Sequence, residues 1–348
     1  MRIVRILMIV VLVCLAVLSA MIGFGTAKAP PPMAALASPF RNVDFTDLPQ
    51  LQHYTARDGA SLAYREYPAM ISSGGVALPT AASQQAAVLL HGASASSMSM
   101  HALAKELAAA GIRVYALDLR GHGDNQPHGD VHYLGQFDDD ITDFARFARP
   151  QHPTALWTLV GFSAGGGLAL RFDAGPEGNL FDRYLLLSPF LNFRAPTQRK
   201  AGSGAPAGGS APKSNIQSFA APYTGRLMAI FTLDSIGIHW FDGLTVVAFA
   251  VPTDSKSFTQ SYSMRLLAGL APRPDYLADI RNIHKPTAVI VGQADEFSIA
   301  EQFAPVIHSQ RQDVPVTILP GLGHLDLITQ PAALAAVRDA LLGSPSRQ

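Results

Sequence analysis

The chain has 348 residues, of which 48% are hydrophobic and 15% are charged, and its 26 basic side chains balance 26 acidic ones. This composition is too apolar for a disordered protein. Zero net charge without a basic run argues against nucleic acid as a partner, because phosphates must be neutralised by clustered Lys and Arg. The single cysteine, Cys14, allows neither an intrachain disulfide nor a thiolate metal cage.

An uncharged apolar run over residues 6–27 opens the chain. As a helix it would extend roughly 33 Å, enough to cross a bilayer. Residues 1–29 are therefore predicted to be a signal anchor or a signal peptide, and we favour the uncleaved anchor because the run is long. Arg2 and Arg5 favour a cytoplasmic N-terminus, which would place the catalytic domain outside the cytoplasm, on the periplasmic or extracellular side. Secretion after signal cleavage is the alternative.

Residues 30–50 are rich in Pro and Ala and are predicted to tether this segment to a globular domain over residues 51–348. Two β-prone runs flank Asp58-Gly59, a pair typical of a tight turn, so the domain is expected to open with an antiparallel hairpin. A Gly-, Ser-, Ala- and Pro-rich stretch over residues 72–83 is predicted to be a loop.

Beyond the hairpin, short apolar runs alternate with helical patterns. Near-continuous apolar strands separated by helices predict an α/β fold, in which a mostly parallel sheet is covered by helices on both faces. Strands are expected over residues 87–90, 113–119, 156–162, 184–188, 287–292 and 314–319. Helices are expected over residues 98–110, 137–147, 164–173, 300–310 and 331–342.

Residues 189–284 show no evident strand-helix unit and are interpreted as an insertion. They include a low-complexity tract, residues 201–212, and two apolar stretches, residues 227–233 and 244–251. Because the insertion leaves the sheet after the strand over residues 184–188, it is predicted to be a lid over the carboxyl edge of the sheet. Its apolar side chains either line a substrate pocket or pack on the body, and both interpretations stay open.

Residues 161–165, with the sequence GFSAG, follow an apolar run and precede a helical pattern. In that context Ser163 is predicted to lie on a nucleophile elbow, a tight strand-to-helix turn that exposes its hydroxyl. A glycine-rich turn without a function is the alternative. A serine nucleophile needs a base and a carboxylate that orients the base. His324 and Asp295 each follow an expected strand, so both would lie at the same edge of the sheet as Ser163.

The chain order Ser163, Asp295, His324 resembles that of the α/β-hydrolases, over about residues 51–342. The likeness is nearest to the monoacylglycerol lipase and serine aminopeptidase-like serine hydrolases, through His91-Gly92-Ala93, Asp118-Leu119-Arg120-Gly121-His122-Gly123 and Gly292-Gln293-Ala294-Asp295. The resemblance implies the α/β-hydrolase fold, with a catalytic triad of Ser163, His324 and Asp295. It also implies that the backbone N–H groups of Ala93 and Ala164 form an oxyanion hole, whereas His91 and residues 118–123 have structural roles.

Other side chains compete for these roles. Glu296 adjoins Asp295 and is the second candidate for the acid, whereas Asp326 is interpreted as a helix N-terminal charge. The imidazoles and carboxylates between residues 122 and 132 could offer metal ligands, but their surroundings favour a loop, and no metal site is predicted. The sequence has no dinucleotide or phosphate cradle, and no cofactor is expected.

These residues together predict an enzyme, a serine hydrolase that cleaves a carboxylic ester through an acyl-enzyme. A lipid-like or medium-chain ester is favoured, because the predicted lid is apolar. The alternatives are a peptidase, a C–C hydrolase or a perhydrolase on the same triad, and a non-catalytic binding protein on a hydrolase scaffold. The expected partners are a small-molecule ester and, through the N-terminal segment, a membrane. The sequence does not decide the oligomeric state.

Overall fold

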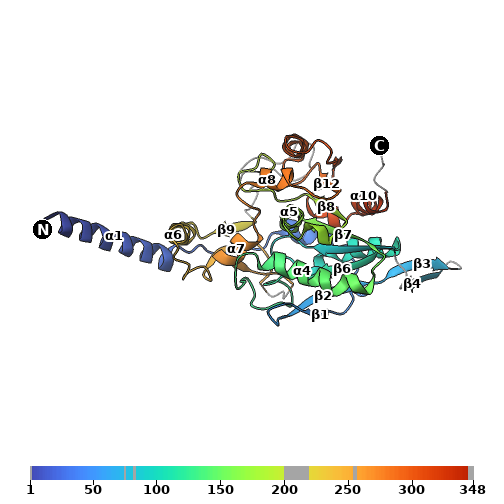
Figure 1. The fold of residues 1–348 in the computed structure, drawn as a ribbon, viewed down its shortest axis with the longest axis horizontal. Helices are drawn as coiled ribbons and strands as arrows, with labels where there is room; N and C mark the ends of the chain where they lie inside the picture. The colour runs from blue at the N-terminus through green and yellow to red at the C-terminus, as the bar shows by residue number, and fades with distance from the viewer. Residues whose placement is uncertain (1, 74–75, 81–83, 200–218, 254–256, 344–348) are drawn as a thin grey trace.

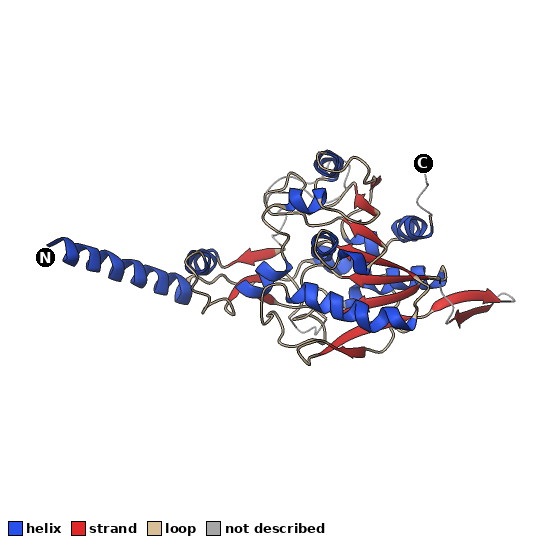
Figure 2. Cartoon of the chain, viewed as in Figure 1, coloured by secondary structure: helices blue, strands red, loops and turns tan. Residues whose placement is uncertain are grey.

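The computed structural model describes residues 2–73, 76–80, 84–199, 219–253 and 257–343, and the low-complexity tract over residues 201–212 lies outside them. An eight-stranded sheet forms the centre of the molecule, in the order β1-β2-β6-β5-β7-β8-β12-β13 (Figures 1 and 2). Its strands are β1 (Gln52–Thr55), β2 (Ser61–Tyr67), β5 (Gln85–Leu90), β6 (Arg113–Leu117), β7 (Leu156–Phe162), β8 (Arg183–Leu187), β12 (Thr287–Gly292) and β13 (Val316–Leu319). Strand β2 pairs antiparallel with β1 and β6, and the remaining pairs are parallel. The predicted hairpin and the mostly parallel sheet are therefore confirmed.

Helices cover both faces of this sheet, as predicted. The main helices of the body are α3 (His101–Ala109), α4 (Gln136–Ala148), α5 (Ala164–Asp173), α9 (Phe303–His308) and α10 (Pro331–Leu342). Helices α3 and α10 bury their apolar side chains on one face, and α4, α5 and α9 bury theirs on the other. Along β5, Val88 and Leu90 point to the second face, and Ala87 and Leu89 point to the first. A strand buried on both faces has to be apolar throughout, and this explains the uninterrupted apolar runs.

Some expected elements begin differently in the structure. A 3₁₀ turn (Ser97–Met100) precedes α3, and another (Ala300–Gln302) precedes α9. Strand β13 begins at Val316, because Pro315 has no N–H to donate to a β-ladder. The helices expected over residues 164–173 and 331–342 have the predicted bounds.

The prediction of a loop over residues 72–83 is wrong for residues 72–73 and 76–80, and its remaining residues lie outside the described ones. Strands β3 (Ala69–Ser73) and β4 (Val76–Thr80) pair antiparallel there, from Ala69 opposite Thr80 to Ser73 opposite Val76. Composition misled the prediction, because Ser and Ala are poor indicators of a strand. The sequence does carry a hairpin signal, since Gly74-Gly75 separates the two strands.

The insertion contains an antiparallel sheet that the sequence analysis did not find, with the order β11-β10-β9. Its elements are β9 (Ala220–Pro222), α6 (Thr224–Asp234), β10 (Thr245–Phe249), β11 (Ser261–Ser263), α7 (Met264–Leu270) and α8 (Tyr276–Arg281). Strands of three residues are too short to show a periodic pattern. Helices α7 and α8 bury Leu266, Leu270 and Ile280 in the core that α4 and α5 also form, so this end of the insertion packs on the body.

Helix α1 (Arg2–Phe24) extends away from the body (Figure 1). Its mean hydropathy is 3.0, and none of its residues is buried. Within the described residues it is the one helix long and apolar enough to cross a membrane. A short helix, α2 (Ala34–Ala37), and a 3₁₀ turn (Ser38–Phe40) follow before the first strand.

Candidate active site

Ser163 occupies the turn between β7 and α5 in a strained backbone conformation, with φ 56° and ψ −117°. Its N–H donates to Leu187 O (2.9 Å), and its carbonyl accepts from the N–H of Phe190 (2.9 Å). These bonds tie the turn to the neighbouring strand. A side chain at Gly165 would lie 2.5 Å from His91 O, so the turn needs a glycine there. The geometry is that of a nucleophile elbow, in which strain is held by the surrounding structure.

His324 and Asp295 form a buried pair at the same edge of the sheet. His324 Nδ1 lies 2.6 Å from Asp295 Oδ2, and Asp295 is fully buried. The other carboxylate oxygen, Oδ1, accepts from the N–H groups of Phe297 and Ser298, both at 2.8 Å. The loop after β12 thus holds the carboxylate through its own backbone and leaves one oxygen for the imidazole.

The imidazole lies beside the elbow. Phe162 directly precedes Ser163, and the centroid of its ring lies 4.8 Å from that of the His324 ring. The centroid of the Phe297 ring lies 5.0 Å from that of the His324 ring. Across the described residues, no hydrogen bond joins the Ser163 hydroxyl to His324. Hydrogen bonds of this kind are often long in a free enzyme and tighten when substrate is bound.

The two other carboxylates near His324 contact its backbone loop and not its ring. Glu296 Oε2 accepts from the N–H of His324 (2.9 Å). Asp326 Oδ2 accepts from the N–H of Gly323 (2.7 Å), and Asp326 lies in the first turn of the 3₁₀ helix Leu325–Ile328. Of the two adjacent candidates for the acid, only Asp295 therefore reaches the imidazole.

Burial and charge act in opposite directions on this pair. Burial by itself would lower the pKa of His324, but the charge and the hydrogen bond of Asp295 raise it above 6.5. Burial would likewise raise the pKa of Asp295, and His324 with the backbone donors brings it below 3.8. The arrangement favours a charged carboxylate and stabilises an imidazolium, as proton transfer from a nucleophile requires.

The residues predicted to supply the oxyanion hole lie against Ser163. A side chain at Gly92 would be only 3.2 Å from Ser163 Cβ, so the loop that carries Ala93 passes directly beside Ser163. Ala164 is the first residue of α5. Neither the N–H of Ala93 nor that of Ala164 donates a hydrogen bond to another described residue. The N–H groups of Ala93 and Ala164 are therefore both without a hydrogen-bond acceptor among the described residues.

The insertion supports this loop from behind, a role that the sequence analysis missed. Ser94 has a positive φ of 65°, and its N–H donates to the hydroxyl of Tyr262 in β11. Its side chain donates to Thr259 O (2.6 Å), and its carbonyl accepts from the N–H of Thr259 (2.8 Å). No local sequence signal could have paired these residues, because they are more than 160 positions apart.

Two buried histidines extend this support. His91 Nδ1 bonds to Gly92 O (2.8 Å), and Nε2 accepts from the N–H of Leu119 (3.1 Å). His122 Nδ1 bonds to Arg120 O (2.9 Å), and Nε2 lies 2.5 Å from the hydroxyl of Tyr262. Burial lowers the pKa of His91 to about 4 and that of His122 to about 3, so both rings are neutral near pH 7.

The loop over residues 118–123 is likewise held by hydrogen bonds. Asp118 accepts from the N–H groups of Ser97 (2.7 Å) and Asp124 (2.9 Å). Arg120 is buried and forms a two-pronged ion pair with Asp140, through Nε (2.8 Å) and Nη2 (2.7 Å). Neither Asp118 nor His122 contacts Ser163 or His324 through any hydrogen bond in the described chain.

A different set of possible metal ligands lies on the insertion. Asp234, at the end of α6, comes together with His239 and Asp242, and their ligand atoms lie within 4.8 Å of one another. His239 Nδ1 is 3.4 Å from Asp234 and 3.3 Å from Asp242. Burial and the neighbouring Asp242 raise the pKa of Asp234 to about 6. Of the possible ligands between residues 122 and 132, His122 instead bonds to Tyr262, and Asp130 pairs with Arg265 (2.8 Å).

The apolar side chains of the insertion divide into two groups. Ile230, Val246, Val247 and Phe249 are buried, whereas Met228, Phe231 and Trp240 are exposed. Within the first group, Val247 and Phe249 belong to the core of the body, as one of the two open interpretations proposed. Among the described residues, the second group belongs to neither of the two cores of the body.

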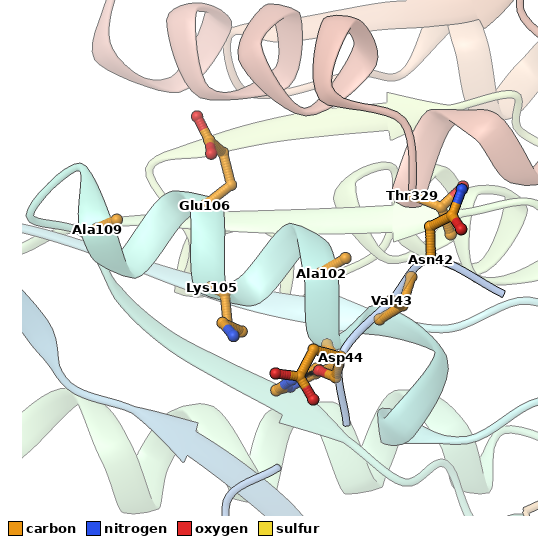
Figure 3. A pocket seen from close by; sticks show the side chains of 9 residues that line it. Asn42, Val43, Asp44, Ala102, Lys105, Glu106, Ala109 and Thr329 are labelled. Atoms are coloured by element: carbon orange, nitrogen blue, oxygen red, sulfur yellow. Dashed lines mark hydrogen bonds between the residues drawn. The ribbon is translucent and has the colours of Figure 1, made fainter. Parts of the chain in front are cut away.

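A surface hollow of about 320 Å³ lies elsewhere, between α3 and the segment before β1 (Figure 3). It is lined by Asn42, Val43, Asp44, His101, Ala102, Lys105, Glu106, Ala109 and Thr329. His101 is held there by Tyr67 through Nδ1 (2.9 Å) and by Asp44 O through Nε2 (3.0 Å). None of the predicted site residues lines this hollow, so it is separate from the Ser163 site.

Residues 81–328 match the sequence model of the family described as serine aminopeptidase, S33. The chain belongs to this family. A monoacylglycerol lipase of Mycolicibacterium smegmatis is 35% identical over 107 residues. The match covers 30% of this chain and 38% of the lipase, so it spans well under half of either protein.

Solved structures share the fold at low sequence identity. A soluble variant of the monoglyceride lipase of Saccharomyces cerevisiae, in complex with a substrate analogue, matches with a TM-score of 0.59 and 18% identity, over 85% of this chain and 94% of that one. The monoacylglycerol lipase of Paleococcus ferrophilus matches with a TM-score of 0.54 and 16% identity, over 81% of this chain and 99% of that one. The fold is therefore that of the α/β-hydrolases, and the family is one of serine hydrolases.

Proposed function

We propose that the protein hydrolyses a carboxylic ester, with Ser163 as nucleophile, His324 as base and Asp295 as the group that orients the base. The observation that carries the proposal is the buried pair of His324 and Asp295 (2.6 Å) beside a serine held at φ 56°. A lone GxSxG turn would not need such a pair. The free N–H groups of Ala93 and Ala164 beside Ser163 support the same assignment.

The reaction follows from the atoms that remain available. Since Asp295 engages Nδ1 of His324, Nε2 takes the proton from the Ser163 hydroxyl as its oxygen attacks the ester carbonyl. The carbonyl oxygen becomes an oxyanion, which the N–H groups of Ala93 and Ala164 would stabilise. The tetrahedral intermediate collapses and expels the alcohol, which receives the proton from Nε2. Water then attacks the acyl-enzyme with His324 again as base, and releases the carboxylic acid and Ser163.

A lipid-like or medium-chain ester is our proposed substrate. The support is the partial sequence match to a monoacylglycerol lipase and the apolar side chains of the insertion. A peptide substrate is the second candidate, because the family description names an aminopeptidase. A panel of p-nitrophenyl esters of increasing acyl length, beside aminoacyl p-nitroanilides, separates the two, and turnover of the anilides alone would favour the peptidase.

The assignment of Ser163 is tested by covalent labelling. We expect a fluorophosphonate to label the wild-type protein, and Ser163→Ala to abolish labelling and to reduce ester turnover by on the order of 10⁴-fold or more. Ser309→Ala is a suitable control, because the Ser309 hydroxyl bonds only to neighbours beside α9: it donates to Val306 O and accepts from Gln310 Nε2. Retained labelling in Ser163→Ala would contradict the nucleophile. A wild-type protein that is neither labelled nor active would favour the non-catalytic binding protein.

We also propose that α1 is an uncleaved membrane anchor, with the catalytic domain outside the cytoplasm. Beyond its length and hydropathy, its C-terminal end is held by the folded domain: Arg226 Nε donates to Ile22 O (2.8 Å), and the N–H of Arg226 donates to Gly25 O (3.2 Å). The full chain should resist extraction from membranes by alkaline carbonate. A mature protein whose N-terminal sequence begins at Pro30 would instead indicate a cleaved signal peptide.

A further inference from the structure

Four large apolar side chains of the insertion are exposed close together in the sequence. Met228 and Phe231 on α6 are 57% and 66% exposed, and Ile236 and Trp240 in the following turns are 68% and 86% exposed. We call these four residues the apolar face. Soluble surfaces rarely leave such a group uncovered, and an exposed apolar patch usually marks an interaction site.

Met228 and Phe231 of the apolar face lie on α6, a helix that contacts the end of α1. Gly25, directly after α1, lies against Gly225 of α6, where a side chain at either position would meet the other backbone at 3.0 Å or less. Arg226 joins the two further, because it donates to Ile22 O through Nε and to Thr245 O of β10 through Nη1 (3.0 Å). Phe24, the last residue of α1, is 88% exposed. The exposed apolar end of α1 therefore lies beside the helix that carries Met228 and Phe231.

The two helices cross. In Figure 1, α1 runs along the plane of the view, whereas α6 is seen nearly end-on at the end of α1. If α1 spans a bilayer, a helix that crosses its end lies along the membrane surface. Met228 and Phe231 share one side of α6, and Ala229, Ile230 and Leu233 are buried on the other. A helix with one face packed on protein and an opposite apolar face suits this interfacial position.

We propose that the apolar face lies in the interfacial region of the bilayer that α1 spans, with lipid as its occupant. The inference rests on the proposed role of α1 as an uncleaved anchor. Lipid is favoured over a second copy of the chain because α6, which carries Met228 and Phe231, packs on the end of the apolar helix α1. The exposed His239 next to Trp240, and the nearby Asp234 and Asp242, keep this turn at the level of the headgroups. Tryptophan is enriched at that depth.

The two tryptophans of the chain provide the test. Trp240 belongs to the apolar face, whereas Trp157 is fully buried in the core against Tyr115. The full chain would be placed in phosphatidylcholine nanodiscs, with or without lipid brominated near the glycerol end of the acyl chain, because bromine quenches nearby tryptophan. Trp240→Phe leaves only the Trp157 emission, and the difference from wild type reports Trp240. We expect brominated lipid to remove most of this difference and iodide in the buffer to leave it intact.

The other outcomes identify what covers the face. Quenching of Trp240 by iodide and not by brominated lipid would place the face in water and overturn the proposal. Quenching by neither would indicate that protein covers it, with a second copy as the first candidate, and would also overturn the proposal. Failure of the chain to stay in nanodiscs after an alkaline wash would contradict the anchor itself. That result is distinguishable from the first two, in which the chain remains inserted.

Discussion

Opposing effects of the surrounding protein set the charge state of His324. Burial favours the neutral ring, whereas the fully buried carboxylate of Asp295 at 2.6 Å favours the charged ring, and the net effect raises the pKa. Glu296 acts on the same residue from a different side, because it accepts the backbone N–H of His324 and adds a smaller favourable charge. Replacing Asp295 and replacing Glu296 are therefore expected to have different effects on the pKa of His324 and on activity.

The pH dependence of ester hydrolysis should report this difference. A base has to be neutral, so kcat/KM should fall as the pH drops through the raised pKa of His324. Asp295→Asn removes the charge that raises this pKa and leaves the burial that lowers it. We expect its acid limb at lower pH than in wild type, and a maximal rate reduced by on the order of 10⁴-fold.

Glu296→Gln is the matched control, because the amide oxygen can still accept the N–H of His324. Its acid limb should move less than that of Asp295→Asn, and its maximal rate should fall less. Profiles of kcat/KM against pH for the wild type, Asp295→Asn and Glu296→Gln show which of the two carboxylates orients the base. A larger loss in Glu296→Gln than in Asp295→Asn would reassign the acid.

At the scale of elements, strand β11 of the insertion supports the loop that carries Ala93. The Tyr262 hydroxyl accepts from Ser94 N–H and contacts His122 Nε2. Because burial raises the pKa of Tyr262 and lowers that of His122, the phenol is protonated and donates to a neutral imidazole. The strand thus helps to hold Ser94 at φ 65°, one residue after the proposed oxyanion donor.

Tyr262→Phe should therefore affect the chemical step more than substrate binding. We expect kcat to fall roughly 10-fold with little change in KM, which is less than the 10² to 10³ typical of losing an oxyanion donor itself. Tyr184→Phe is a matched control, since the hydroxyl of this buried tyrosine donates to Gly178 O (2.8 Å), away from the site. An equal loss of kcat in both variants, together with equally lowered thermal stability, would indicate packing alone.

At the scale of the whole molecule, α1 contacts the rest of the chain at its C-terminal end and contributes to neither core. No residue of α1 is buried, whereas the two cores on either face of the sheet include no residue of the first thirty. The hydrogen bonds at the end of α1 involve Arg226, and beyond it Met33 N–H donates to Ala250 O (2.9 Å). We therefore expect the sheet, its helices and the Ser163 site to stay folded when α1 is removed.

We expect residues 30–348 to form a soluble protein with nearly wild-type kcat/KM on a short, water-soluble ester. The same protein should be slower than the full chain on esters dispersed in vesicles, because it lacks the anchor that concentrates it at the membrane. Fractionation and paired assays on the two substrates test this. Loss of activity on the soluble ester, with normal folding by circular dichroism, would show that α1 has a direct role in the site.

Several features were predictable because local sequence dictates them. The GFSAG turn between an apolar strand and a helix required Ser163 at an elbow, and the bounds of α5 and α10 followed from helical patterns with clear ends. The parallel sheet followed from strands that are apolar on both faces. The hairpin of β3 and β4 was missed although Gly74-Gly75 marked it, because its composition is typical of loops.

Tertiary structure alone decided the contacts between distant segments. Asp295 and Glu296 are neighbours with similar side chains, and only the folding of the loop after β12 against His324 directs one to the imidazole and the other to the backbone. The pairing of Tyr262 with Ser94 spans 168 positions and has no periodic signature. The exposure of Phe231 and the burial of Ile230 depend on which side of α6 the body covers. Sequence specifies which side chains are apolar, but the partner that covers them is set by packing across the whole chain.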